Sequence, residues 1–298
     1  MKNRIKFSTP VSLGAALAVS AFCSVSVFAD SSFDKKDNLK TEKIDEMVIV
    51  SSRIEQPIRE IGTSVSVLTE QDISLLGSNS LADVLRTLPS VNVSNSGGVG
   101  KATALRIRGE ESYRTMVLID GMNVADPSTP QTLVQVDQIM TAGIGRIEVL
   151  RGSQGMMYGA DAGGVVNIST RQLDDGFAGS VGGQAGRYGT QQLFGQIGGG
   201  NELADFYLSA TDYKTDGFNA STRDLYPTDD DGYENTTYHA RFGINVAEGW
   251  RLEWVTRQVD GINEYDNVYA STDFVSNEYD QNNNLINVSY DGSVFDHE

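Results

Sequence analysis

The chain has 298 residues, with 40 acidic and 23 basic side chains, a net charge of −17 and one cysteine, Cys23. So negative a chain disfavours binding to nucleic acid and to anionic membrane surfaces, and a single cysteine excludes a disulfide scaffold and a cysteine-based metal centre. Beyond residue 29 the sequence has no long uninterrupted apolar run, so it can cross a membrane only as β-strands.

The first 29 residues have the features of a secretory signal peptide. Lys2, Arg4 and Lys6 precede an apolar stretch from Val11 to Phe28, and Val27-Phe28-Ala29 is a small-residue cleavage site. A membrane-spanning helix is the alternative, but serine residues interrupt the stretch. Removing residues 1–29 leaves 20 basic against 40 acidic residues, a net charge of −20, and no cysteine.

An extended segment, residues 45–52, follows a polar tether at residues 30–44. It reads Asp45-Glu46-Met47-Val48-Ile49-Val50-Ser51-Ser52 and is rich in β-branched residues. One interpretation is the first strand of a domain. The other is a strand offered to the sheet edge of a partner, with the tether supplying reach.

Residues 53–172 predict a domain of mixed α and β structure. Ser64 to Leu68 alternates as a strand, and two capping patterns, Thr69-x-x-Asp72 and Ser80-x-x-Asp83, predict two short helices that end at Gly77 and Pro89. Further strands are predicted at residues 90–93, 104–108, 115–120, 146–150 and 165–170.

From residue 173 onward the pattern changes to strands with one apolar and one polar face. Tyr238, Phe242 and Ile244 alternate with His239 and Arg241. Similar alternation occurs at residues 191–198, 206–213, 250–257 and 286–291; the turn at 247–249 is tight, whereas residues 211–232 and 260–283 predict long loops. We expect about six strands at the start of a β-barrel, with a soluble β-sandwich as the alternative.

Enzyme motifs are incomplete. The segment Ser96–Ala102 resembles a phosphate-binding loop, but Asn95 replaces its first glycine and Ala102 its hydroxyl residue, so we expect a solvent-exposed loop. The two histidines, His239 and His297, have no evident catalytic partners. The sequence therefore predicts no enzyme and no catalytic residues.

Charged residues within the predicted strands of the mixed domain are the first candidate site. Arg108, Glu148 and Arg151 stand beside apolar residues, where a charge is costly to bury unless it is paired. They are either solvated strand ends or an ionic patch that joins this domain to the barrel wall.

Acidic loops are the second candidate site. Asp229, Asp230 and Asp231 lie in one long loop, and Tyr265 and Asp266 lie in the next. Adjacent carboxylates repel one another unless a cation bridges them, and calcium takes several oxygen ligands. The alternatives are a calcium site and two solvated loops.

The most informative pattern is residues 144–170, where Ile147-Glu148-Val149-Leu150-Arg151-Gly152 leads through a glycine-rich loop into the strand at 165–170. Together with Leu118-Ile119-Asp120-Gly121, it resembles the plug domain of TonB-dependent outer-membrane receptors. The segment Asp45–Val50 resembles the TonB box of that family, between signal and plug.

The resemblance implies an α+β plug domain (53–172) followed by the first strands of an antiparallel transmembrane β-barrel (173–298). It implies a receptor in the outer membrane, without enzymatic activity, that takes up a scarce metal chelate. The expected partners are TonB, outer-membrane lipid and the chelate, and we expect a monomer that binds no nucleic acid.

The resemblance also assigns roles to residues. Asp45, Glu46, Met47, Val48, Ile49 and Val50 would bind TonB, and Arg108, Glu148 and Arg151 would make the ionic contacts between plug and barrel. The cobalamin receptors of the family carry calcium-binding loops, which Asp229, Asp231, Tyr265 and Asp266 match, although Asn219 and Pro227 depart from them. Cobalamin is therefore the favoured cargo, a ferric siderophore the second, and a surface receptor without transport the third.

Plugged transporters close with roughly 22 strands, whereas residues 177–298 supply about six. An open sheet leaves backbone groups unpaired at both edges, which lipid does not tolerate. We expect an amino-terminal fragment, either a partial record or a truncated gene.

Overall fold

The computed structural model describes residues 47–48, 56–57, 62, 64–129, 131–152, 158, 163–171, 176–219, 230–265 and 276–290. The predicted signal peptide and tether lie outside the described residues. Among the described helices, none is long and apolar enough to cross a membrane.

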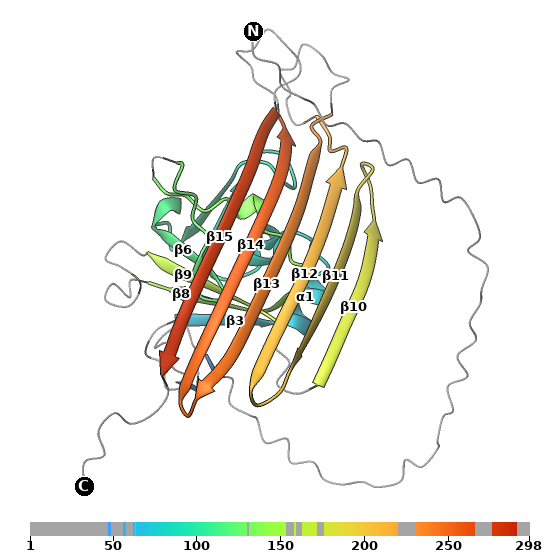
Figure 1. Cartoon of the computed structure of the whole chain (residues 1–298). Coiled ribbons are helices and arrows are strands. Elements are labelled where there is room, and N and C mark those ends of the chain that lie inside the picture. The colour runs from blue at the N-terminus through green and yellow to red at the C-terminus, as the bar shows by residue number, and fades with distance from the viewer. Residues whose placement is uncertain are drawn as a thin grey trace, which may run out of the picture. The chain divides into compact units, whose positions relative to one another are not determined.

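The domain predicted to be a plug, called the plug domain below, combines short helices with a five-stranded sheet (Figure 1). Its elements are β3 (Ser64–Thr69), α1 (Glu70–Leu76), α2 (Leu81–Arg86), β4 (Val91–Asn95), β5 (Thr103–Ile107), η2 (Ser112–Arg114), β6 (Thr115–Ile119), β7 (Met122–Asn123), η3 (Val136–Gln138), β8 (Ile144–Arg151) and β9 (Gly164–Thr170). The strand order is β3-β8-β9-β6-β7, in which only the β6–β9 pair is parallel. β4 and β5 form a separate hairpin.

The capping patterns of the two helices have different outcomes. The capping box of α1 is confirmed, because Thr69 and Asp72 bond each other's backbone amides, and Gly77 ends the helix at φ +62°. Ser80 stands at the N-cap of α2 as predicted, but its side chain makes no capping hydrogen bond. The backbone of Ser80 instead lies in an extended bridge with Met140. This bridge ties the start of α2 to the segment before β8.

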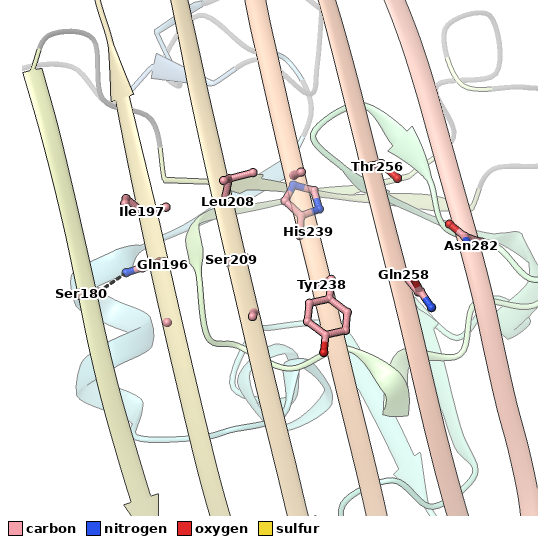
Figure 2. Close-up of a pocket in the computed structure, with 13 residues that line it drawn as sticks. Ser180, Gln196, Ile197, Leu208, Ser209, Tyr238, His239, Thr256, Gln258 and Asn282 are labelled. Carbon is pink, nitrogen blue, oxygen red and sulfur yellow. Dashed lines mark hydrogen bonds between the residues drawn. The ribbon is translucent and has the colours of Figure 1, made fainter. Parts of the chain in front are cut away.

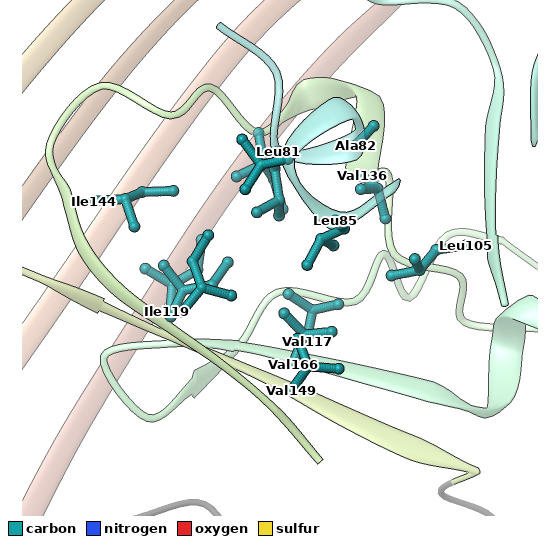
Figure 3. Packing of buried hydrophobic residues seen from close by; sticks show 14 of the residues in the cluster. Leu81, Ala82, Leu85, Leu105, Val117, Ile119, Val136, Ile144, Val149 and Val166 are labelled. Atoms are coloured by element: carbon teal, nitrogen blue, oxygen red, sulfur yellow. The ribbon is translucent and has the colours of Figure 1, made fainter. Parts of the chain in front are cut away.

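The core of the plug domain lies between α2 and one face of the sheet (Figure 3). Leu81, Val84 and Leu85 recur at helical spacing and are fully buried. They pack with strand residues that include Val117, Ile147, Val149, Val166 and Ile168. This apolar packing fixes the ends of β6 and β9, from which the candidate site is built.

The second half of the described chain is a six-stranded antiparallel sheet (Figure 1). Its strands pair in chain order and are β10 (Gly176–Ala185), β11 (Gln191–Gly200), β12 (Ala204–Thr215), β13 (Tyr233–Ala247), β14 (Trp250–Glu264) and β15 (Ser276–Tyr290). β14 and β15 reach further than the sequence predicts, into residues expected in a long loop. Both faces of the strands are polar in this part, so the sequence lacks the alternation of apolar and polar residues that predicts a strand.

The two faces of the sheet have opposite character. One face contacts the plug domain and buries residues such as Tyr207, Tyr233 and Val255. The other carries an apolar row that crosses four paired strands, namely Phe206, Phe242, Trp254 and Ile286, of which the last three are exposed. This apolar outer row, with the Trp250–Tyr290 pair near the strand ends, is typical of a lipid-facing surface with an aromatic girdle. The predicted alternation is therefore confirmed, and the predicted fold class with it.

The loop between β4 and β5 lies against the sheet, so the prediction that it is solvent-exposed is wrong. Gly100 and Lys101 are buried, and Gly100 has φ +78°. A Cβ atom at Gly100 would overlap the ring of Tyr233 on β13. Glycine is needed here for both the left-handed backbone and the close approach.

Replacing Gly100 by alanine should therefore destabilise the protein by about 1–3 kcal/mol more than the same change at Gly109. Gly109 is a matched control, because its φ is +81° but a Cβ atom there would meet no atom within 4 Å. The measurement is the thermal unfolding midpoint of the natural protein that contains this chain, purified in detergent. Equal midpoints for the two variants would contradict the close packing.

Candidate functional site

The candidate site is the contact between the plug domain and the inner face of the six-stranded sheet. On the plug side it is built at the turn after β6, where Asp120 has φ +46° and Gly121 has φ +77°. The Asp120 carboxylate accepts hydrogen bonds from the backbone amide and the hydroxyl of Thr170, both at 2.8 Å. Thr170 ends β9, so the carboxylate joins two neighbouring strands of the plug domain and is held in one orientation.

On the sheet side, two residues of β13 reach the same carboxylate. His239 Nε2 lies 2.8 Å from Asp120 Oδ2, and Arg241 Nη1 lies 3.5 Å from Oδ1. The three side chains are at most 7% exposed. Arg241 also donates to the hydroxyl of Thr170 at 3.2 Å. This buried ionic cluster of Asp120, His239 and Arg241 therefore links the plug domain to the sheet directly.

More charges surround Arg241 on the inner face of the sheet. Asp205 and Glu253 lie 4.0 Å and 3.9 Å from its Nε atom, and Arg251 contacts Asp205 at 2.5 Å. Opposite charges at such distances stabilise one another once they are removed from water. The inner face of β12 to β14 thus carries an alternating ionic network, with Asp120 as the member that the plug domain supplies.

Two opposing effects act on the pKa of the Asp120 carboxyl. Burial would raise the pKa, but the hydrogen bond and charge of His239, the charge of Arg241 and the Thr170 amide together lower it below its usual range. Asp120 is therefore a carboxylate at neutral pH. Its charge offsets the cost of burying Arg241.

A second contact lies further along β13, near η3. Tyr233 donates its hydroxyl to Gln138 Oε1 at 2.9 Å, and Asn235 donates to the same oxygen at 3.3 Å. Arg257 on β14 donates to the Gln138 carbonyl at 3.3 Å. In the same 3₁₀ turn, burial raises the pKa of Asp137 to about 6. The plug domain is thus fixed to the sheet through its turns and the end of β9.

The three residues predicted to form plug–barrel ionic contacts are divided between two places. Arg151 donates to the hydroxyls of Ser64 and Ser66 on β3 and to the Pro89 carbonyl; burial, and then the charge of nearby Arg108, lower its pKa. Glu148 is buried and bonds Arg146 at 2.8 Å. Because residues 148 and 151 alternate along a strand, they project from opposite faces of β8. The described contacts of Glu148 and Arg151 lie within the plug domain, and their role toward the barrel stays a prediction.

The predicted TonB box is described at two residues. Met47 and Val48 form β1 and pair antiparallel with β2, Gln56–Pro57. The segment is therefore extended at this point, as strand addition to a partner requires. Asp45, Glu46, Ile49 and Val50 lie outside the described residues, and binding to TonB stays a prediction.

The predicted calcium ligands are also described in part. Asp231 is buried and Tyr265 is exposed, whereas Asp229 and Asp266 lie outside the described residues. Within the described ranges no group of three or more histidine, cysteine or acidic side chains is placed to hold a metal. The calcium site stays a prediction.

A hollow of about 610 Å³ lies over the sheet (Figure 2). Small residues form its floor, namely Gly195, Ala210 and Ala240, with Leu208 and Tyr238 beside them. These residues alternate with the ones that contact the plug domain, so they belong to the outer face of the sheet. The hollow therefore lies on the face away from the plug domain, and the ionic cluster at Asp120 remains the candidate site.

Sequence reasoning missed the partnership between His239 and Asp120. Two signals were present in the sequence, since His239 and Arg241 occupy the polar face of a predicted strand, and Asp120 ends an apolar strand just before a glycine. Their pairing joins residues 119 positions apart. Periodicity within a strand carries no information on such a distant contact.

Comparisons with known proteins agree with this architecture. Residues 57–166 match the model of the TonB-dependent receptor plug domain. The chain is 36% identical over 231 residues to the vitamin B12 transporter BtuB of Photobacterium profundum, which covers 76% of this chain and 37% of that protein. The chain thus spans little more than a third of the length of this curated relative.

Solved structures share the fold at lower identity. The chain is similar to FpvA of Pseudomonas aeruginosa bound to heterologous pyoverdines, with a TM-score of 0.65, 18% identity, and coverage of 83% of this chain and 34% of FpvA. It is also similar to the siderophore receptor PirA of Acinetobacter baumannii, with a TM-score of 0.54, 22% identity, and coverage of 67% and 32%. Fold, plug-domain match and curated relative agree, and the chain belongs to the family of TonB-dependent outer-membrane receptors.

Proposed function

We propose that the natural protein that contains this chain takes up a scarce metal chelate through the outer membrane, driven by TonB, and that cobalamin is its cargo. The observation that carries the proposal is the 36% identity with a vitamin B12 transporter. A ferric siderophore is the second candidate, because receptors for siderophores share the fold. A surface receptor that binds without transporting is the third.

The position of β3 supports a route for the applied force. The segment that resembles the TonB box precedes β3, and β3 is an edge strand that pairs only with β8 among the described strands of its sheet. A pull from the amino terminus therefore reaches an edge strand, whose six residue pairs with β8 and whose bonds to Arg151 resist it. Peeling an edge strand breaks fewer contacts at a time than removing a central one.

The ionic cluster supports a resting state in which the plug domain stays seated. Asp120 follows β6, which lies at the other side of the sheet from β3. Separating the domain from the sheet would break the contacts of the Asp120 carboxylate with His239 and Arg241. The cluster thus anchors the domain at rest, and the movement of the domain away from the sheet that uptake requires in this proposal has to break it.

Replacing Val48 by proline should abolish uptake of radiolabelled cyanocobalamin by cells and leave its binding to the cell surface intact. Proline removes a backbone donor and cannot take part in strand addition on that side. Val48→Ala is the matched control, because it keeps the backbone amide and should retain most of the uptake. The measurement compares both variants with the natural protein in a strain without any other cobalamin receptor.

Excess unlabelled cobalamin should compete with the labelled vitamin, and a ferric siderophore should not. Uptake of a radiolabelled ferric siderophore without uptake of labelled cobalamin would replace the cargo, whereas surface binding of cobalamin without uptake by the natural protein would favour the non-transporting receptor. Normal uptake by the Val48→Pro variant would contradict the role of this segment.

Replacing Asp120 by asparagine should lower the stability of the natural protein by about 3 kcal/mol, because the buried His239 and Arg241 would lose the carboxylate that the plug domain supplies. The folded-state pKa of Asp120 is lowered. The contribution of its carboxylate to the free energy of unfolding is therefore complete above the ordinary aspartate pKa of about 4, and it is lost as the pH falls below that value and through the folded-state pKa. The thermal unfolding midpoint, measured in detergent from pH 8 to pH 3, should show a constant difference that shrinks below about pH 4.

Asp83→Asn serves as the control. Asp83 forms a surface ion pair with Arg86 at 3.2 Å, and both side chains are about half exposed. Such pairs contribute roughly 0–1 kcal/mol, so the control should unfold close to the natural protein. Equal midpoints for the Asp120 and Asp83 variants would show that the cluster does not hold the plug domain in place.

A further inference from the structure

The loop at the tip of the β4–β5 hairpin is built as a rigid support for Lys101. The side chain of Asn95 bonds the loop from within, since its amide nitrogen donates to the Gly98 carbonyl at 2.7 Å and its oxygen accepts from the Gly97 and Gly98 amides at 2.9 and 2.6 Å. The Lys101 carbonyl accepts from Thr103 at 2.7 Å. The backbone of Lys101 is therefore fixed before its side chain makes any contact.

The Lys101 ammonium lies in a group of three oxygens supplied by the sheet. It donates to the Gly232 carbonyl at 3.0 Å, to Asn263 Oδ1 at 2.8 Å, and to the Glu264 carbonyl. An ammonium has three donors, and each of these has an acceptor. Lys101 is only 5% exposed, so the charge is held largely out of water.

These three oxygens mark the roots of two loops. Gly232 immediately precedes β13 and closes the loop that follows β12, whereas Asn263 and Glu264 end β14 and open the loop before β15. The two roots are also bonded to each other, because the Gly232 amide donates to the Glu264 carboxylate and the Glu264 amide donates to the Gly232 carbonyl, both at 3.0 Å. The ammonium therefore sits where the loop roots meet.

The sequence of these two loops is strongly acidic. Residues 216–232 and 265–275 contain one base, Arg223, against Asp216, Asp224, Asp229, Asp230, Asp231, Asp266 and Asp273. Carboxylates brought near one another repel unless a cation is present. Lys101 brings a positive charge to the base of both loops from a different domain.

We propose that Lys101 is an internal cation that joins the roots of the two loops to the plug domain. A metal ion binds carbonyl and amide oxygens in a similar way. Because this cation is instead an ammonium on the plug domain, the order of the two loop roots depends on the plug domain itself. A rearrangement of the loops would then be transmitted to the β4–β5 tip through the ammonium. This consequence for uptake rests on the proposed function, whereas the structural role of Lys101 does not.

The test is hydrogen exchange, followed by mass spectrometry, on the natural protein that contains this chain. In the Lys101→Met variant, the Gly232 and Glu264 amides should exchange about tenfold faster or more, because a charged hydrogen-bond partner has been lost from a buried site. Lys214→Met is the matched control, since Lys214 on β12 pairs with Glu234 on β13 at the exposed, outer face of the same sheet. That variant should exchange like the natural protein at both amides.

Amides of the β6–β9 pair report whether the plug domain is still folded. If the Lys101→Met variant also loses protection at the β6–β9 amides, Lys101→Arg and Lys101→Gln are compared instead. Faster exchange of the Gly232 and Glu264 amides in the glutamine variant alone would then support the proposal. Unchanged exchange at Gly232 and Glu264 in a folded Lys101→Met protein would overturn it. The measurement requires no transport, so a failure of the proposed cargo or of TonB coupling would not alter its result.

Discussion

The buried contact of Asp120 with His239 and Arg241 is the interaction on which the arrangement of the two parts depends. Each of these side chains would be costly to bury alone, and the contacts of Asp120 with His239 and Arg241 exist only while the plug domain lies against the sheet. Such a contact provides firm attachment together with specificity, because a displaced domain loses both of the contacts that Asp120 makes with the sheet at once. Apolar packing alone would permit many nearby positions.

The remaining contacts divide the plug domain into a part that is held and a part that can be pulled. Asp120, Gln138 and Lys101 all lie in turns or loops and reach β13 or β14. The edge strand β3 is instead held by β8 and by Arg151 within the domain. In the proposed function, a pull through β3 would disturb the domain from the side opposite its anchors. The hydrogen bonds of Lys101 would meanwhile couple the loop roots to the position of the plug domain.

Much of the fold follows from local sequence pattern, and most of the site does not. Thr69 and Asp72 form the capping box that their spacing predicts, and Tyr238 and Phe242 lie on the predicted apolar face of their strand. The contacts of His239 with Asp120 and of Lys101 with Asn263 join residues more than a hundred positions apart. Such contacts are set by how the domains pack, which periodicity does not encode. The loop at Ser96–Ala102 was expected in solvent for the same reason, because its glycines indicate a turn but not the Tyr233 ring that covers it.

Movement of the plug domain away from the sheet during uptake is the central claim, and a cysteine at Thr211 tests it most directly. Thr211 is buried and lines a small cavity of about 40 Å³ between the sheet and plug residues that include Ile139 and Ile168. Residues 30–298 contain no natural cysteine. We predict that a water-soluble thiol reagent labels Thr211→Cys slowly in resting cells and much faster when cyanocobalamin and TonB are both present. Rapid labelling at rest, or a rate that neither cyanocobalamin nor TonB changes, would contradict the account.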